Sequence, residues 1–428
     1  MAKAAKAKKS PSKNGNSTHG GSVLVGAGCV VINPPLGAAL VGYPKGRPNA
    51  GVGLDLCARA VAFAAPGAKA PQGALVVIDT IGVWADIVAR IRRKAAQLVS
   101  GLAGETLLVA ATHTHSAPTL HSWRKGGKVV EAADEKYVQQ VVDGAAAAVA
   151  AAWGAARPAT IRVSSTEAFL GHNRRALDAA GKAHAEWLDP DGRHTGYFNP
   201  IVPFVAFDDA ATGKVHAMIV SYWCHPVTLG PPNTIASPDY PGYFVRKLEK
   251  DTGAAVVLHL TGGGANINPR QALFDNPAHA ERMGLELAGK VLAALPSAGR
   301  CAAGRVRSVS VALKLLVAKP DDENLAGRVE DSPAGKTLTT EVQALAVGDL
   351  AFVTAPGELF AEIGTGMLKA SPFPHTIVVG YADDYLGYLF TDQAKAEGGY
   401  EPSNPVSEQI EQPLLAAAKE AMNKALGK

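Results

Sequence analysis

Apolar residues recur along the chain in two patterns, one with the period of a strand and one with the period of a helix. Short apolar or alternating runs bounded by turn residues are typical of strands, and apolar residues three and four apart are typical of a helix. The patterns predict strands over 22–32, 58–63, 73–80, 105–115, 160–166, 202–209, 214–223, 254–263, 305–316, 340–354 and 375–385. They predict helices over 86–99, 134–153, 241–252, 277–295 and 407–426. Because strands and helices are mixed without a repeat or a long linker, we expect one large α/β domain (mixed α+β) over residues 22–428.

The composition is that of a globular protein without a nucleic-acid partner. Of the 428 residues, 47% are hydrophobic and 19% are charged, which excludes a mostly disordered chain. The net charge of +4 arises from 42 basic and 38 acidic side chains, and five of the lysines lie within residues 1–13. The rest of the chain is nearly neutral, which argues against a nucleic-acid-binding surface. The cysteines are far apart and none forms the CxxC pair of a thiolate zinc site.

The lysine-rich start of the chain, residues 1–21, has no apolar segment of the kind found in signal peptides. We predict a disordered basic tail there, because a short lysine cluster usually stays solvated. No run of about 20 apolar residues occurs, so we expect a cytoplasmic protein without stable membrane insertion.

The strongest local motif is the pair of histidines in Thr112-His113-Thr114-His115-Ser116, at the end of an apolar run. Residues two apart on an extended strand share one face, so both imidazoles can point the same way. Imidazole is a ligand that suits zinc. The same pattern also fits a hydrogen-bonded polar strand end, and the motif alone leaves both interpretations open.

Further candidate residues follow other predicted strands: His225, Glu358, Tyr385 and Tyr388. Each has an ordinary structural explanation as well, since a glutamate after Pro-Gly suits the first turn of a helix and a tyrosine commonly packs with one hydroxyl partner. Spacing alone does not assemble these residues, because they are spread over more than half of the chain.

Several longer segments occur in the order known from one enzyme family. PPLGAALVGYP and LDLCARAVAF precede THTHSAP, which is followed by HNRR, WCHPVTL, SPDYPGYF, GGGANINP, PGELF, DDYLGYLFT and EGGYE. With these segments the chain resembles the N-terminal catalytic domain of the neutral (neutral/alkaline, non-lysosomal) ceramidases, zinc amidohydrolases that cut the amide of ceramide. The resemblance spans roughly residues 22–402 and implies a ceramidase-like zinc hydrolase domain.

The resemblance implies one zinc ion per chain. His113, His225, Glu358 and Tyr388 match the family's ligands, and water completes the site. Two neutral imidazoles with a carboxylate and a phenol are chemically suitable for a hydrolytic zinc, because they leave a coordination position open.

The resemblance also implies the catalytic residues, with one departure. His115 matches a histidine near the reacting carbonyl, Arg174 an arginine that contacts substrate, and Tyr400 a second active-site tyrosine. The family's Gly-Asp-x-Ser-Pro loop has a serine at the catalytic centre, whereas this chain has Asn266 and Asn268 in the places of the aspartate and the serine. An amide side chain cannot be an acyl nucleophile, but it can donate a hydrogen bond to an oxyanion.

The expected activity differs from that of a ceramidase in its substrate. The chain resembles a shorter, bacterial-type relative without the family's C-terminal immunoglobulin-like domain, and this difference and the missing serine both disfavour ceramide. We expect a zinc-dependent amidohydrolase that cleaves an amide or related acyl bond of a small molecule by attack of zinc-bound water. The alternatives are hydrolysis of a lactone, ester or phosphoester, and a degenerate family member that only binds a ligand.

Overall fold

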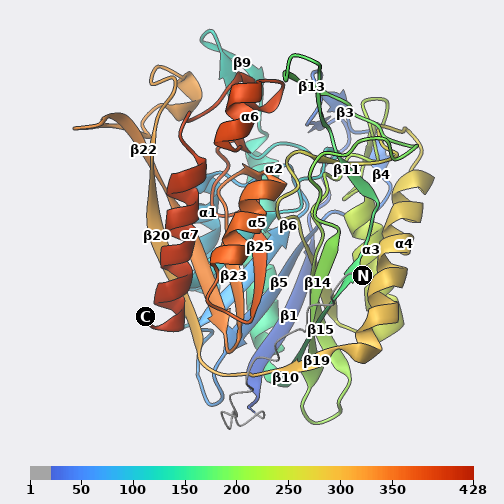
Figure 1. Ribbon diagram of the computed structural model, residues 1–428. Coiled ribbons are helices and arrows are strands. Elements are labelled where there is room, and N and C mark those ends of the chain that lie inside the picture. The colour runs from blue at the N-terminus through green and yellow to red at the C-terminus, as the bar shows by residue number, and fades with distance from the viewer. Residues whose placement is uncertain (1–20) are drawn as a thin grey trace, which may run out of the picture.

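Two β-sheets packed face to face form the centre of the fold (Figure 1). The computed structural model describes residues 21–428, and the predicted tail over residues 1–21 lies outside this part of the chain apart from Gly21. The larger sheet has nine strands in the order β17 (Val256–Leu260), β15 (Val215–Ser221), β14 (Ile201–Asp209), β10 (Arg157–Glu167), β1 (Val23–Val31), β5 (Cys57–Ala64), β6 (Gly73–Ile78) and β7 (Leu107–Ala111), with β19 (Gly299–Cys301) paired to β10. The smaller sheet has five strands in the order β20 (Val306–Leu316), β22 (Gly335–Val347), β23 (Leu350–Thr354) and β25 (His375–Val379), with β21 (Val329–Ser332) paired to β22.

The inner faces of the two sheets share one apolar core. Phe63 on β5 lies at the centre of this core and is fully buried. Within the larger sheet, its ring centroid is 5.4 Å from that of Phe207 on β14. Across the interface between the sheets, its ring centroid is 6.2 Å from that of Phe352 on β23. Aromatic contacts at these separations stabilise the packing beyond the burial of their area.

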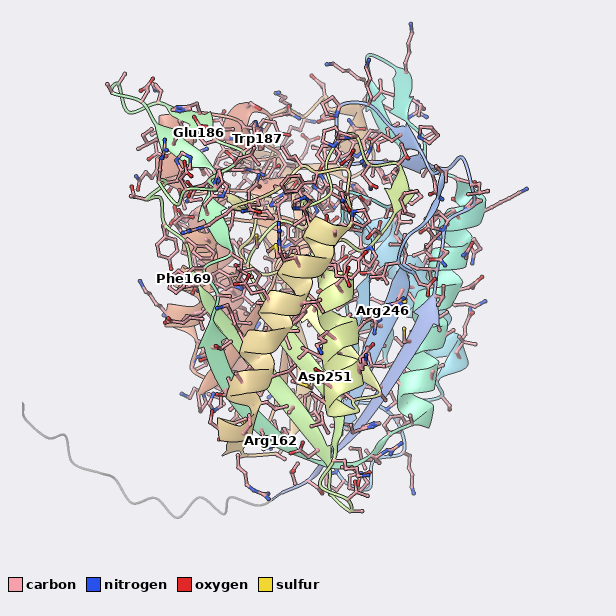
Figure 2. All side chains as sticks on the ribbon, turned by 90° about the vertical axis from the view of Figure 1, so that its right-hand side faces the viewer. Arg162, Phe169, Glu186, Trp187, Arg246 and Asp251 are labelled. Atoms are coloured by element: carbon pink, nitrogen blue, oxygen red, sulfur yellow. The ribbon has the colours of Figure 1, made fainter. Side chains whose placement is uncertain are left out.

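Helices cover the outer face of each sheet, so the fold has four layers. The helices are α1 (Ala85–Leu98), α2 (Glu135–Gly154), α3 (Tyr240–Thr252), α4 (Ala278–Ala294), α5 (Ala361–Ala370), α6 (Asp392–Glu397) and α7 (Glu411–Leu426). The first four pack on the larger sheet, while α5 and α7 lie on the opposite side of the molecule, against the smaller sheet (Figures 1 and 2). Helix α1 illustrates how a helix packs on a sheet through one apolar face. It buries Ile87, Val88, Ile91 and Ala95, which form one stripe at helical spacing.

Short strands build the end of the molecule at which the candidate site lies. They are β2 (Ala39–Leu40), β3 (Arg47–Pro48), β4 (Gly51–Val52), β8 (Trp123–Lys125), β9 (Lys128–Glu131), β11 (Gly171–Asn173), β12 (Arg175–Leu177), β13 (Ala183–Ala185), β16 (Ile235–Ala236), β18 (Ile267–Pro269), β24 (Glu358–Leu359) and β26 (Tyr388–Leu389). Figure 2 shows Glu186 and Trp187 at this end and Arg162 at the other. Within residues 21–428, no helix has the length and apolar character needed to cross a bilayer.

The predicted fold class is confirmed, and most predicted elements are present. The segment 340–354 differs, because it forms two strands, β22 and β23, joined by a turn in which Gly348 has a φ of 61°. Helix α5 agrees with the helix that the sequence suggests after Glu358, although Glu358 itself lies on β24. The patterns do not predict helix α6, because it is short and contributes few apolar repeats.

Three parallel strand pairs, β6–β7, β15–β17 and β23–β25, direct the loops after them to the same end of the molecule. Hydrogen bonds tie these loops together. Thr261 after β17 donates from Oγ1 to the carbonyl of Thr112 after β7 (3.0 Å), and its own carbonyl accepts from the N–H of Gly380 after β25 (2.9 Å). The junction of the two sheets therefore positions the side chains that follow these strands.

Candidate active site

His113 lies in the loop after β7 and not on an extended strand. The expectation that 105–115 continues as a strand is wrong, because β7 ends at Ala111 and His113 has a φ of 68°. The N–H of Ala111 donates to the carbonyl of Tyr381 (3.0 Å), and that of His113 donates to the carbonyl of Thr80 (2.9 Å). These bonds hold His113 in a left-handed conformation that is unfavourable for a residue with a Cβ and that clusters at functional sites.

The imidazoles of His113 and His115 nevertheless meet, together with that of His225 from the loop after β15. The Nε2 atom of His113 is 3.2 Å from that of His225 and 3.2 Å from that of His115. The ligand atoms of all three histidines lie within 4.8 Å of one another. Gly42 makes room for the His115 ring, since a Cβ there would lie 2.5 Å from Cγ of His115.

Backbone carbonyls fix the tautomers of two of these histidines. Nδ1 of His113 lies 2.6 Å from the carbonyl oxygen of Ile81, and Nδ1 of His225 lies 2.6 Å from that of Gly264. A carbonyl only accepts, so each Nδ1 carries the proton and each Nε2 presents a lone pair to the shared centre. Histidines that bind metals are held in this way.

His115 lacks this arrangement. Its Nδ1 is buried and has no hydrogen-bond partner among residues 21–428. Burial, and then the neighbouring His113 and His225, lower the pKa of His115 well below its usual value. The ring is therefore neutral at pH 7 and can accept a proton.

Glu358 on β24 contributes a carboxylate to the same centre. Its Oε1 accepts a hydrogen bond from the hydroxyl of Tyr385 (2.6 Å), and its Oε2 lies 3.3 Å from Nε2 of both His113 and His225. Oε2 is buried and has no hydrogen-bond partner in the described part of the chain. Burial alone would raise the pKa of Glu358, but His113 and His225 hold it well below its usual value.

The converging atoms fit a divalent metal such as zinc. Two oriented imidazole nitrogens and one buried carboxylate oxygen are donor types found at catalytic zinc sites. An unpaired buried carboxylate oxygen is costly, and a cation bound between the three groups would offset that cost.

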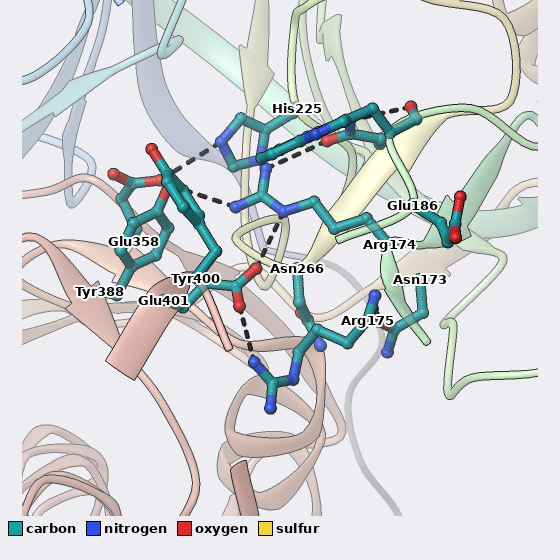
Figure 3. A network of polar contacts seen from close by, with 12 residues as sticks. Asn173, Arg174, Arg175, Glu186, His225, Asn266, Glu358, Tyr388, Tyr400 and Glu401 are labelled. Atoms are coloured by element: carbon teal, nitrogen blue, oxygen red, sulfur yellow. Dashed lines mark hydrogen bonds and ion pairs between the residues drawn. The ribbon is translucent and has the colours of Figure 1, made fainter. Parts of the chain in front are cut away.

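Arg174, in the segment between β11 and β12, forms the second half of the site (Figure 3). Its guanidinium is buried and donates to Oε1 of Glu401 (2.9 Å), to Oδ1 of Asn268 (3.2 Å) and to the hydroxyl of Tyr388 (3.2 Å). Burial would lower the pKa of Arg174, but Tyr388 and Glu401 raise it, so the group stays charged. Arg175 donates to the other oxygen of Glu401 (2.7 Å) and shares its charge.

The two asparagines that replace the family's aspartate and serine have different surroundings. Asn266 accepts from the N–H of Ala361 at the start of α5 (3.0 Å) and donates to Glu362 (2.9 Å), so it holds the loop to that helix. Asn268 accepts from Arg174 and donates from Nδ2 to the carbonyl of Trp187 (3.2 Å). Asn268 is thus the one of the pair that faces the arginine.

Tyr388 and Tyr400 lie next to each other, with ring centroids 5.8 Å apart. Tyr388 is paired in register with Glu358 through β24 and β26. Tyr400 is 52% exposed, and its ring centroid is 5.7 Å from the Arg174 guanidinium. Its position is at the rim of the site.

The structure brings the residues suggested by the resemblance into one neighbourhood and adds two that were not assigned a role. Glu401, the buried counter-ion of Arg174, is 227 positions away in sequence, and only its place in the segment EGGYE pointed to it. The sequence offers Tyr385 as a candidate beside Tyr388, but nothing in it indicates that the Tyr385 hydroxyl binds Glu358. The metal and catalytic roles themselves remain predictions.

Comparisons with known proteins agree with this picture. The model of the family described as neutral/alkaline non-lysosomal ceramidase, N-terminal, matches residues 24–270, more than half of the chain. The neutral ceramidase of Pseudomonas aeruginosa has a similar structure, with a TM-score of 0.77 and 19% identity over 95% of this chain and 74% of that chain. A structure described as ceramidase complexed with C2 gives a TM-score of 0.74 and 19% identity over 95% of this chain and 75% of that chain. No curated protein sequence matches.

Proposed function

Because the chain belongs to the neutral/alkaline non-lysosomal ceramidase family, we propose that it is a zinc-dependent hydrolase that cleaves an amide, or a related acyl bond, of a small substrate. We propose further that residues 22–428 act as one catalytic domain. The observation that carries the proposal is the orientation of His113 and His225, whose Nε2 atoms face Oε2 of Glu358, an atom without a hydrogen-bond partner among residues 21–428.

We assign the zinc ligands to His113, His225, Glu358 and Tyr388, and a proton-transfer role to His115. The first two histidines have the backbone-held Nδ1 typical of ligands, whereas Nδ1 of His115 is not held. A zinc ion bound there supplies Lewis acidity, which lowers the pKa of water and polarises a carbonyl group.

The remaining groups bind and orient the substrate. Neutral His115 can take a proton from the attacking water at Nε2 and return it to the leaving amine. Arg174 keeps a fixed positive charge beside Asn268 and Tyr388, where an oxyanion developing from the carbonyl would be stabilised. Because the amide of Asn268 is not a nucleophile, we propose that water attacks the carbonyl directly and that no acyl–enzyme forms.

The test combines metal analysis with a hydrolysis screen. Purified protein should contain about one zinc per chain, and removal of the metal by a chelator should abolish hydrolysis of small N-acyl amides until zinc is restored. Matched esters, lactones and phosphoesters in the same screen separate amide hydrolysis from the alternative reactions. Hydrolysis of amides that survives complete metal removal would refute the zinc-dependent reaction.

A further inference from the structure

A small pocket lies beside the site on the side of Tyr385 and Tyr388. It has a volume of about 260 Å³, and its walls include Trp84, His121 and Trp123 as well as Tyr400. The two tyrosines connect it to the site, because the Tyr385 hydroxyl binds Glu358 and the Tyr388 hydroxyl accepts from Arg174. A group in this pocket would therefore lie one side chain away from the proposed metal and the arginine.

Aromatic rings dominate one wall of the pocket. Trp84 stacks on His121 with ring centroids 4.9 Å apart and planes at 18°, and its centroid is 5.0 Å from that of Tyr385. Trp123 packs edge-on against Trp84 and His121, with its ring centroid 6.4 Å from that of Trp84 and 6.0 Å from that of His121. Rings arranged in this way provide flat apolar surfaces on which another ring or a short alkyl group can pack.

Two of the three charged side chains of the lining have a counter-ion within residues 21–428. Arg328 forms a salt bridge with Asp384, and Glu401 forms salt bridges with Arg174 and Arg175. The remaining acidic side chain of the lining, Asp322, accepts from the N–H of Asn324 (2.9 Å). Asp322 has no counter-ion among the described residues, so an anionic ligand would lose its hydration, gain no counter-ion and meet this carboxylate, which is unfavourable.

The hairpin of β8 and β9 closes one side of the pocket and is fastened to the segment that follows β20. The N–H of Arg124 donates to Oδ1 of Asn324 (2.8 Å), and Nδ2 of Asn324 donates back to the carbonyl of Arg124 (3.0 Å). The N–H of Gly127 donates to the carboxylate of Glu323 (3.1 Å). These bonds hold this wall of the pocket in place.

We propose that this pocket binds one arm of the amide substrate, and that this arm is a compact, neutral, apolar group such as a phenyl ring or a short acyl chain. The inference rests on the proposed function of the adjacent site. Pockets for drug-sized ligands have volumes of about 300–1,000 Å³, so a pocket below that range accommodates a group smaller than a drug and cannot enclose a long alkyl chain. The enzyme should therefore prefer compact amides over a lipid with two long chains.

The proposal is tested first by binding, without catalysis. Phenylacetamide is added to metal-free protein, and its contact is followed by saturation-transfer NMR with the wild-type chain and with Trp123→Leu. Trp153→Leu is the matched control, because Trp153 lies at the end of α2, away from the pocket lining. We expect binding to the wild type and to Trp153→Leu, and about 10-fold weaker binding to Trp123→Leu, which corresponds to the upper range for one aromatic contact. Absence of binding to the wild type overturns the proposal, whether or not the variants fold.

The second test measures kcat/KM for acetyl, phenylacetyl and dodecanoyl amides of glycine, for acetyl amides of benzylamine and dodecylamine, and for a ceramide. We expect the best substrate to carry one phenyl-sized group, with the dodecyl compounds and the ceramide at least about 10-fold poorer. A preference for the dodecyl compounds or the ceramide overturns the proposal. If phenylacetamide binds but no amide is cleaved, the proposed function fails while the pocket assignment stands.

Discussion

The hydroxyl of Tyr385 donates to Oε1 of Glu358 across 2.6 Å and leaves Oε2 of the same carboxylate facing His113 and His225 at 3.3 Å. The tyrosine therefore selects which carboxylate oxygen is available to a metal. Burial, and then the charge of Glu358, raise the pKa of Tyr385 well above its usual value, so the hydroxyl keeps the proton that it donates.

We predict that Tyr385→Phe weakens zinc affinity by about 10- to 100-fold, the usual effect of removing a hydrogen bond to a metal ligand. Competition with a chromophoric chelator measures the affinity. Tyr381→Phe is the matched control, because the Tyr381 hydroxyl is buried without a partner among the described residues while its ring stacks on His113 at 4.2 Å. Equal zinc affinities in both variants would show that Tyr385 does not position Glu358.

The three histidines should separate into two classes. His113→Ala and His225→Ala should lose most of the zinc, because each removes an Nε2 that a backbone carbonyl orients. His115→Ala should keep the zinc and lose about 100-fold or more in kcat, the usual contribution of a general acid–base group. Elemental analysis and steady-state kinetics on the same samples measure both quantities. Loss of zinc from His115→Ala would instead make His115 a ligand.

The sequence predicts the sheets well, because their strands are continuous apolar runs. β5 is buried at every position, and the run 58–63 already shows this. The sequence also predicts a helix well where one apolar stripe is long, as in α1. The site is less accessible to sequence reasoning. The left-handed conformation of His113 depends on the carbonyl of Thr80, from another strand's loop, and local sequence carries no signal for it.

The pairing of Arg174 with Glu401 illustrates the same limit. The two residues meet only because the segment after α6 folds back over β12, and no spacing rule connects them. The resemblance to a family assigned a substrate contact to Arg174, whereas the structure shows that the residue also holds a buried ion pair.

Arg174→Ala should therefore cost stability as well as activity. Breaking a buried ion pair by removing one partner costs about 3–5 kcal/mol, and the remaining bond from Arg175 to Glu401 favours the lower end. Urea denaturation measures the change in the free energy of unfolding. Arg193→Ala is the control, because Arg193 pairs with Asp191 on the surface with its side chain 80% exposed, and we expect little change there. An unchanged stability in Arg174→Ala would show that the network does not support the fold.

Asp79, at the end of β6, should make stability depend on pH. Burial raises its pKa from 3.8 to about 6, although its Oδ2 accepts from the N–H of Cys57 at 2.8 Å. The folded state thus binds the proton more tightly than the unfolded state, and stability falls as the pH rises from about 4 to about 6.

We predict that Asp79→Asn removes this component. Relative to the wild type, the free energy of unfolding of the variant should rise by about 3 kcal/mol between pH 3 and pH 7, the equivalent of the shift in pKa. Urea titrations at several pH values measure the difference, and Asp191→Asn on the surface provides the comparison. A constant difference across this range would mean that Asp79 is ionised in the folded protein at low pH.

Asn268 decides between a direct attack by water and a covalent mechanism. Its Oδ1 accepts from Arg174 and its Nδ2 donates to the carbonyl of Trp187, so the side chain is held in place beside the arginine. If it contributes one hydrogen bond to the oxyanion, Asn268→Ala should lower kcat by about 10²–10³-fold at most. Asn268→Ser should not confer ceramidase activity, because the compact pocket beside Tyr388 is unchanged.

The covalent alternative is tested by single-turnover hydrolysis in ¹⁸O-labelled water, followed by mass spectrometry of both the released acid and the protein. Both routes place the label in the acid, because water also attacks the acyl carbon when a seryl acyl–enzyme is hydrolysed. The protein mass separates them: direct attack leaves it unchanged, whereas an acyl–enzyme adds the mass of the acyl group to the chain. Ser116 is the residue to inspect if an adduct is found, since it follows the histidine pair. It is buried, and its Oγ accepts a hydrogen bond from Nδ2 of Asn233 at 3.0 Å, which makes it a poor nucleophile in this conformation. An adduct on Ser116 would therefore demand both a covalent mechanism and a rearranged loop, and Ser116→Ala would then abolish turnover while leaving the zinc content intact.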